Sequence, residues 1–377
     1  MNPGAARWLL VMIVVVVAVG GCSLPASSPR PGSESLPASE PPIDYVALEA
    51  EIEKAITSGP VTLDNVRAVL VSVDGESRIA HYRHGFTGDD HLHVFSVTKS
   101  VVSILIGIAI ADGLIAGVDQ PLAELMPDHR QAMSAETADV TLRQLMTMSG
   151  GFDDYLHVSQ WREAAEPGGD FVDLLLARPQ YPPGKAFWYS DPSAHLVAAV
   201  LAAALDRADG NRPRTVLDYA REKLFDPLGI STDPAFTRPV PDLFAPEFAT
   251  AGFGWATDPN GIQLGMFGLR LTAPDMLRIG ELYRRDGVWN GQQIVPADWI
   301  RQSTAPSTLS KEYGMLWWIL GESEGPGYAA FGRGGQQIVV LPESRAVIVY
   351  LSDLQPDSEI TGEDVKPLND VFVEAFA

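Results

Sequence analysis

The chain has 377 residues, of which 46% are hydrophobic and 20% charged, so most of it is expected to bury a core. Acidic residues outnumber basic ones, 48 Asp and Glu against 27 Lys and Arg, which gives a formal net charge of −21. This excess of negative charge argues against nucleic acid as a partner. A single cysteine excludes an intrachain disulfide and a metal site built from several cysteines.

The first 21 residues have the pattern of an export signal. One cation, Arg7, precedes an apolar run over residues 8–19, which is short for a transmembrane helix. The run ends in VGGC, and this resembles the bacterial lipobox, in which the cysteine, here Cys22, is lipidated after cleavage. An ordinary signal peptide or an uncleaved anchor is the alternative. We expect a lipid-anchored protein of the bacterial cell envelope, held outside the cytoplasm.

The segment that follows predicts a tether. Residues 22–42 are rich in Pro and Ser and offer little apolar surface to bury, so they are expected to be extended. The globular domain is expected over residues 43–377. Its negative charge would not attract an anionic bilayer, and contact with the membrane is therefore expected through the lipid alone.

Hydrophobic periodicity and turn residues predict helices and strands along the globular part. The predicted elements are a helix over residues 46–56, a hairpin of residues 67–73 and 77–83 around Asp74-Gly75, helices over 96–111, 141–148 and 194–205, short helices and loops over 218–299, strands over 313–320, 327–331, 336–341 and 346–351, and a final helix around Phe372. This order predicts an α/β protein of the α+β type: one antiparallel sheet built from both chain ends, with a helical lobe inserted within about residues 97–300. A functional site is expected in the cleft between lobe and sheet.

The strongest chemical signal is FSVTKS, in which Ser96 opens the long apolar helix and Lys99 follows three residues later. On a helix these two side chains share a face and can touch. A serine hydroxyl needs a neighbouring base or cation to act as a nucleophile, and a helix N-terminus favours developing negative charge. A serine N-cap beside a lysine that reaches solvent is the structural alternative.

Two further segments contain candidate site residues. PPGKAFWYSD predicts a turn and a short aromatic strand that could direct Tyr189 into the cleft, and a tyrosine beside an ammonium can act as a general base. Alone, Tyr189 would be read as a core or rim aromatic. AAFGRGGQ predicts a glycine-rich hairpin that lets backbone approach a ligand, or simply a turn. It does not fit a phosphate loop, because no helix follows the glycines.

These three segments, in this order, resemble the serine β-lactamase and penicillin-binding-protein superfamily. The chain is most similar to class C β-lactamase-related esterases and amidases, including 6-aminohexanoate-oligomer hydrolases. LRQLMTMSGGFDD, GLRLTAPDMLRIGELYRRDGVWNGQQIVPADWI and GGQQIVVLPESRAVIVYLSD extend the resemblance over roughly residues 60–355. It implies the β-lactamase/transpeptidase-like fold.

The resemblance also implies roles. Ser96 would be the acylated nucleophile, Lys99 would lower the barrier to its deprotonation, and Tyr189 would relay the proton to the leaving group. The family's third motif is best matched by Arg333-Gly334-Gly335, which would bind substrate, and the backbone N–H groups of Ser96 and Gln336 would form the oxyanion hole. No metal or cofactor is expected to take part.

Two positions depart from the family pattern. The family's Tyr-x-Asn is Tyr189-Ser190-Asp191 here, and an ionised Asp191 accepts hydrogen bonds but cannot donate one. The third motif starts with Arg333 in place of Lys or His, and this cation could hold a substrate carboxylate or pair with Asp191. Both changes argue against β-lactam recognition and favour a carboxylesterase or amidase.

Histidines give weaker signals. His91 and His93 lie beside two aspartates, which allows a metal site, although a polar loop before the nucleophile helix is the simpler interpretation. His195 follows the tyrosine motif, but no surrounding pattern favours a Ser-His arrangement.

The sequence therefore predicts an envelope-anchored serine hydrolase that forms an acyl-enzyme with a small-molecule or peptide ester or amide. The alternative is a catalytically weak penicillin-binding-like domain that recognises cell-wall peptide.

The lipobox assignment makes a direct prediction. Cys22→Ala should block lipid attachment, because no other residue offers the thiol that is acylated. Metabolic labelling with a palmitate analogue should disappear in this variant and persist in Ser23→Ala. Unchanged labelling of Cys22→Ala would show that the lipid is attached elsewhere.

Overall fold

The computed structural model describes residues 43–152, 163–209, 214–240, 245–321, 325–354 and 360–376. The predicted signal, the tether and Cys22 lie outside the described residues. Within these residues, every helix is too short or too polar to qualify as a membrane span.

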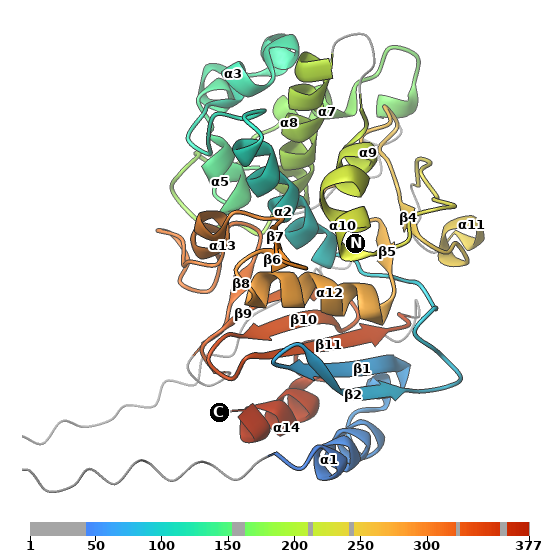
Figure 1. Cartoon of the computed structure of the whole chain (residues 1–377). Coiled ribbons are helices and arrows are strands. Elements are labelled where there is room, and N and C mark those ends of the chain that lie inside the picture. Colours follow the sequence, from blue (N-terminus) through green and yellow to red (C-terminus); the bar gives the residue numbers. More distant parts are fainter. Residues whose placement is uncertain are drawn as a thin grey trace, which may run out of the picture. The chain divides into compact units, whose positions relative to one another are not determined.

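The described unit contains a six-stranded antiparallel sheet, which lies in the lower part of Figure 1. Its strands, in spatial order, are β2 (Glu76–Tyr82), β1 (Val66–Val73), β11 (Ala346–Ser352), β10 (Gln336–Leu341), β9 (Tyr328–Gly332) and β8 (Trp318–Ile319). The first strand, β1, pairs with the last strand, β11, so the sheet is built from both ends of the chain. The predicted fold class is therefore confirmed.

The β1–β2 hairpin forms where the sequence predicts it. Asp74 and Gly75 have φ values of 56° and 80°, the two positive values that a tight hairpin turn requires, and both residue types tolerate them. Successive side chains of β1 also point to opposite faces of the sheet, as expected for a strand. Val69 and Val71 pack on one face of the sheet, and Leu70 packs on the other.

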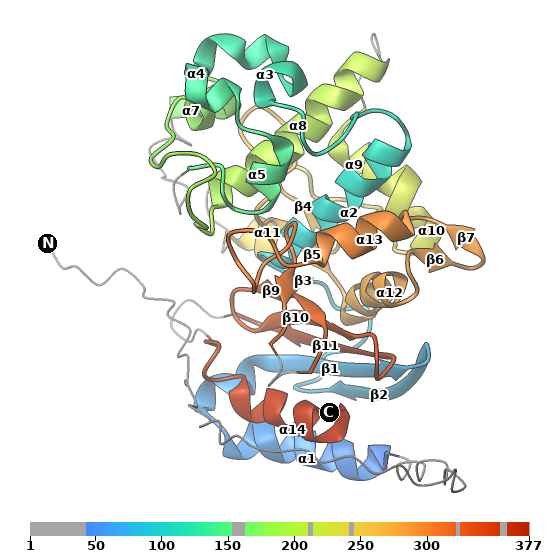
Figure 2. The same ribbon diagram turned by 90° about the vertical axis from the view of Figure 1, so that its left-hand side faces the viewer.

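Helices cover both faces of the sheet. On the outer face lie α1 (Tyr45–Ser58) and α14 (Lys366–Phe376), which contact each other, and on the inner face lies α12 (Ala273–Arg284) (Figures 1 and 2). The outer core is small, whereas the inner core continues into the helical lobe.

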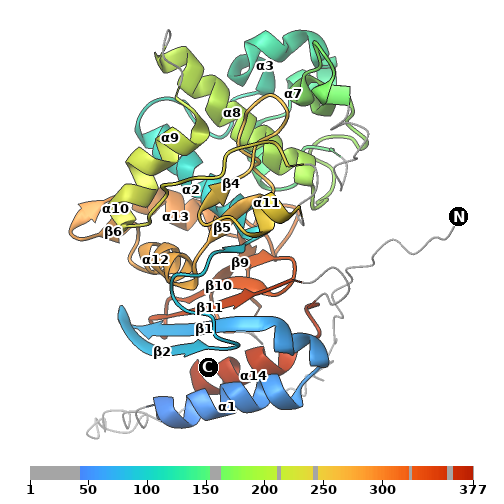
Figure 3. The same cartoon turned by 90° about the vertical axis from the view of Figure 1, so that its right-hand side faces the viewer.

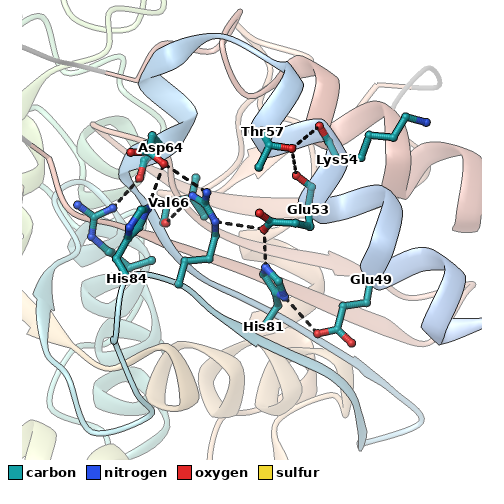
Figure 4. Close-up of polar contacts among 10 residues, drawn as sticks. Glu49, Glu53, Lys54, Thr57, Asp64, Val66, His81 and His84 are labelled. Atoms are coloured by element: carbon teal, nitrogen blue, oxygen red, sulfur yellow. Dashed lines mark hydrogen bonds and ion pairs between the residues drawn. The ribbon is translucent and has the colours of Figure 1, made fainter.

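Charged side chains fasten α1 to the edge hairpin (Figure 4). The two ring nitrogens of His81 on β2 lie 3.1 Å and 2.9 Å from Glu49 and Glu53, which stand one turn apart on α1. Beyond the ends of α1 and β2, Asp64 Oδ1 lies 3.1 Å from Nε2 of His84. Carboxylates only accept hydrogen bonds, so a doubly protonated His81 ring would donate to both glutamates.

The helical lobe stands on the inner side of the sheet, beyond β9 and α12 (Figures 2 and 3). Its longest elements are α2 (Val97–Ala111) and α8 (Asp191–Asp209), which pack together in the core. The shorter helices are η1 (Val61–Asn65), which precedes β1, and α3 (Leu122–Leu125), η2 (Pro127–Ala132), α4 (Ala135–Ala138), α5 (Leu142–Met146), α7 (Phe171–Leu176), α9 (Val216–Ala220), η3 (Arg221–Phe225), α10 (Asp226–Leu228), α11 (Pro246–Ala249) and α13 (Ala297–Ser303).

Three features of this region differ from the prediction. Short strands occur within it: β3 (Leu92–His93), β5 (Leu269–Leu271) and β4 (Gly254–Trp255) form one small sheet, and β6 (Val288–Trp289) and β7 (Gln292–Gln293) form another. Helix α12 lies on the main sheet and not in the lobe. The strand predicted over residues 313–320 is reduced to β8, because Leu316 has φ 63° and the Gly314 N–H bonds to the Trp317 carbonyl, so the chain turns back there.

One glycine lets the nucleophile helix pack closely. A Cβ on Gly107, in the middle of α2, would lie 2.3 Å from the indole of Trp299 on α13. Gly107 is buried in α2 and Trp299 belongs to the inner core, so the indole has little room to move.

We predict that Gly107→Ala lowers the free energy of unfolding by about 1–3 kcal/mol, because the new methyl group displaces Trp299. Gly117→Ala is the matched control, since a Cβ there has no neighbour within 4 Å among the described residues. Urea unfolding measures both. Equal stability of the two variants would contradict the packing argument.

Candidate active site

Ser96 lies at the turn that leads into α2. The preceding residue, Phe95, has φ 47°, an uncommon value for a bulky side chain and one often found at functional sites. Among the described residues, the Ser96 hydroxyl caps none of the free N–H groups of α2. It accepts instead a hydrogen bond from the Lys99 ammonium at 2.9 Å. The alternative of a serine N-cap with a solvent-seeking lysine is therefore wrong.

Lys99 is 1% exposed and its ammonium has three acceptors. Besides Ser96, it donates to Asp191 Oδ1 at 2.7 Å and to the backbone carbonyl of Met266 at 2.9 Å. An ammonium carries three N–H groups, so each has a partner. A lysine buried in an apolar helix would be costly without such partners.

These contacts determine the charge of Lys99. Burial by itself would lower the pKa of the ammonium, but the Asp191 carboxylate, together with the neighbouring Tyr189, outweighs burial and raises the pKa above its ordinary value. Lys99 is therefore protonated at neutral pH, and it can stabilise negative charge on Ser96 but cannot remove its proton. The structure thus pairs Asp191 with Lys99 through Oδ1.

Tyr189 lies beside the same ammonium, whose Nζ is 4.8 Å from the centre of the Tyr189 ring. Its position follows from the start of α8, three residues earlier than predicted. The Ser190 hydroxyl accepts the Ser193 N–H at 3.0 Å, as an N-cap does, and Asp191 is the first helical residue. The YSD sequence thus directs Tyr189 and Asp191 from one helix terminus toward Lys99.

An aromatic wall surrounds Tyr189. Its ring stacks on Trp318 of β8, with centroids 5.6 Å apart, and meets the buried Tyr313 edge-on at 6.0 Å. Trp318 also contacts Phe331 of β9. Trp317, its neighbour, points the other way and stacks on Tyr283 in the core. Of these two adjacent tryptophans, Trp318 therefore lies in the aromatic wall and Trp317 in the core.

The glycine-rich hairpin approaches the nucleophile through Gly332, the last residue of β9. A Cβ there would lie 2.4 Å from the Val94 carbonyl, two residues before Ser96. Gly334 and Gly335 have φ values of 79° and 83° and pack against Leu354 and Ile360. Their glycine identity is thus explained by the turn, and contact with substrate remains a prediction, as it does for the exposed Arg333.

The oxyanion role of Gln336 stays a prediction, and its place in the sheet bears on it. It lies on β10, an interior strand, in register with Gly332, and its side chain is bonded to the backbone of Ser352 on β11. A backbone N–H of β10 points along the sheet toward β9 or β11, and not past β9 toward Ser96. The end of β9 is the part of this hairpin that adjoins the nucleophile turn.

Two histidines have structural partners. His195 is buried in α8, where Nε2 lies 3.0 Å from Asp258 and Nδ1 accepts the Gly265 N–H, so neither nitrogen is available to Ser96. His93 is buried on β3 and accepts the Gly268 N–H, which corrects its interpretation as part of a polar loop. The sequence did not identify Met266 as a site residue. It contacts Lys99 through its backbone carbonyl, a group that every residue type has.

Comparisons with known proteins identify the family and the fold. The Beta-lactamase family model matches residues 67–366. A 6-aminohexanoate-dimer hydrolase from Paenarthrobacter ureafaciens is 24% identical over 330 residues, which cover 81% of this chain and 74% of that protein. A penicillin-binding protein homologue from Caulobacter crescentus superposes with TM-score 0.64 at 19% identity, covering 89% of this chain and 98% of that one. A family VIII carboxylesterase superposes with TM-score 0.61 at 13% identity, covering 87% and 96%.

The resemblance noted from the sequence is thus confirmed over most of the chain. Hydrolases of esters and amides share this fold with penicillin-binding proteins, so the fold alone does not select a substrate. With the family model matched across the sheet and the lobe, the chain belongs to the beta-lactamase family of serine hydrolases.

Proposed function

We propose that this protein hydrolyses uncharged carboxylic esters or simple amides through an acyl-enzyme on Ser96. The observation that carries the proposal is the 2.9 Å contact between the Ser96 hydroxyl and a buried ammonium that Asp191 keeps charged. A serine so placed is activated by a cation and lies at a helix N-terminus, where negative charge is stabilised.

Tyr189 acts as the proton carrier. Because Lys99 is protonated, another group must take the proton as Ser96 attacks the carbonyl carbon. The Tyr189 phenol, next to the ammonium, relays it: the phenol oxygen accepts the Ser96 proton while its own O–H proton moves to the leaving alcohol or amine. Water subsequently attacks the ester on Ser96, with the same groups acting in reverse.

The oxyanion of the intermediate is held by backbone N–H groups. One belongs to Ser96, and we assign the other to the end of β9 at Gly332, in place of Gln336. Such donors contribute on the order of a few kcal/mol each to the transition state. Within the described residues, β8 pairs with β9 only at Tyr328 and Ala329, which leaves this end of β9 open to a substrate.

The charges around Ser96 favour a neutral substrate. Lys99 and Asp191 balance each other, and the remaining wall is formed by Tyr189, Trp318 and Phe331. A substrate carboxylate would meet the Asp191 charge, whereas an uncharged acyl group would meet aromatic rings. This is why we favour esters and simple amides over penicillins.

We further propose that the enzyme is anchored in the bacterial envelope through a lipid on Cys22. The support is the apolar run that ends in VGGC and the Pro- and Ser-rich stretch of residues 22–42 after it. A lipid and an extended tether would hold the hydrolase at the membrane while substrates reach it from the aqueous side.

Ser96→Ala tests the nucleophile. Turnover of p-nitrophenyl butyrate should fall at least about a thousandfold, and labelling by a fluorophosphonate should disappear, because no oxygen remains to be acylated. Thermal unfolding should change little. Ser303→Ala, which removes a buried hydroxyl in α13, is the control that keeps activity. Turnover by Ser96→Ala at the wild-type level would exclude Ser96.

The same proteins distinguish the alternative function. A penicillin-binding-like domain would bind cell-wall peptide, or be acylated slowly by a fluorescent penicillin, without turning over any ester of a broad panel. If Ser96 were still required for labelling, that result would favour recognition of cell-wall peptide over the proposed hydrolase function.

Asp191→Asn tests substrate charge. Removing the carboxylate should shift the ratio of kcat/KM for nitrocefin over p-nitrophenyl butyrate upward by about tenfold, which corresponds to about 1–2 kcal/mol in a partly hydrated cleft. The wild-type protein should hydrolyse nitrocefin poorly. Asp370→Asn, on the surface of α14, should leave the ratio unchanged. High wild-type efficiency on nitrocefin, or an unmoved ratio in Asp191→Asn, would refute the electrostatic argument.

A further inference from the structure

The third acceptor of the Lys99 ammonium, the Met266 carbonyl, is held on both sides by buried histidines. Met266 belongs to a short loop, residues 265–268, which we call the Met266 loop. The Gly265 N–H donates to His195 Nδ1 at 3.3 Å, and the Gly268 N–H donates to His93 Nε2 at 2.9 Å. These two bonds flank the carbonyl that Lys99 contacts.

The two histidines come from the elements that carry the other two acceptors. His93 lies on β3, three residues before Ser96, and His195 lies on α8, one turn after Asp191. All three acceptors of the ammonium are therefore tied to the same two pieces of backbone. Displacement of either piece would move a histidine and an acceptor together.

The glycines let the Met266 loop sit close to α8. A Cβ on Gly265 would lie 2.3 Å from the Ala194 carbonyl and 2.9 Å from the Ala198 methyl group. Gly268 has φ 93°, which favours glycine. The loop backbone thus rests directly on the helix that starts at Asp191.

Asp258 sets the tautomer of His195. Its Oδ1 accepts the backbone N–H groups of Asn260 and Ile262, each at 2.9 Å, so Oδ2 is the oxygen that faces His195 Nε2. Nε2 therefore carries the hydrogen, and Nδ1 is free to accept from Gly265. Both Asp258 and His195 are 0% exposed, so water does not compete.

His93 is held in its accepting form by its surroundings. Burial, together with the positive charge of Arg270, keeps the pKa of His93 well below its ordinary value. The ring packs against Phe95 with centroids 3.8 Å apart, and Phe95 immediately precedes the nucleophile.

We propose that His93 and His195, the latter oriented by Asp258, are positioning residues that aim the Met266 carbonyl at the Lys99 ammonium. With the third N–H so engaged, the other two are directed at Ser96 and Asp191. Without it, the ammonium could rotate away from the Ser96 hydroxyl. The catalytic consequence rests on the proposed function, whereas the effect on Lys99 does not.

Asp258→Asn is the sharpest test, because it changes no volume. The amide oxygen must stay with the Asn260 and Ile262 N–H groups, which puts the amide NH₂ opposite His195 Nε2 and forces the hydrogen onto Nδ1. The Gly265 bond is then lost. Nitrogen-15 NMR of the His195 ring reports this change of tautomer directly.

The readout is the pKa of Lys99, followed by NMR of protein labelled with [ε-¹³C]lysine. The chain has six lysines, so Lys99→Arg assigns the signal. We expect Asp258→Asn to lower the pKa of Lys99, because the ammonium loses an acceptor, and to reduce kcat for p-nitrophenyl butyrate about tenfold with a smaller change in KM. Ser72→Ala, which breaks a buried bond to Glu281 instead, is the control for lost stability.

A pair of variants at His93 repeats the test on the other side of the loop. His93→Gln keeps an acceptor near Nε2 and should behave like wild type, whereas His93→Leu should resemble Asp258→Asn. If His93→Leu does not fold, Asp258→Asn decides alone.

A flipped His195 tautomer with an unchanged pKa of Lys99 and unchanged kcat would overturn the proposal. So would equal losses in His93→Gln, His93→Leu and Ser72→Ala. Failure of the proposed hydrolase function would appear elsewhere, as full activity of Ser96→Ala.

Discussion

The buried ammonium of Lys99 is the constraint around which the active site is arranged. A charge taken out of water in the inner core is tolerated only if each of its N–H groups has an acceptor, and here the acceptors come from three separate segments. The nucleophile turn, the start of α8 and the Met266 loop must therefore converge on one point. Misplacing any of them would leave a buried donor unpaired, so the same requirement that stabilises the lobe also aligns the catalytic groups.

The main sheet contributes a rigid border to this arrangement. Strand β9 touches α2 and closes against the nucleophile turn at Gly332, where any side chain would collide with the Val94 carbonyl. Behind it, β10 and β11 are covered on both faces by helices. The proposed site thus combines the Lys99, Tyr189 and Asp191 side chains of the lobe with the end of β9 on the sheet, and neither part contains all of it.

Much of this could be predicted from the sequence because it follows from local pattern. The Ser96–Lys99 spacing, the Asp74-Gly75 turn and the order of strands and helices are properties of short segments. Other features depend on distant partners. The predicted strand over residues 313–320 failed because Leu316 takes a left-handed conformation between α2 and α5, fixed by contacts with Ser100 and Met146. The role of Gln336 is equally hard to predict, because strand neighbours, and not residue type, decide where its backbone N–H points.

The pairing of the first strand with the last affects how fast the sheet can form during folding. Strand β1 ends at Val73 and β11 begins at Ala346, and between them lies the entire helical lobe. Contacts so distant in sequence form slowly, since a long loop must close before they stabilise anything. A chain emerging from a ribosome would hold β1 and β2 as an exposed hairpin, with the valine-rich flank of β1 unpaired, until β11 had been delivered. Completion of the sheet therefore waits for β11, and any factor that shields β1 in the interval would act as a chaperone for this fold.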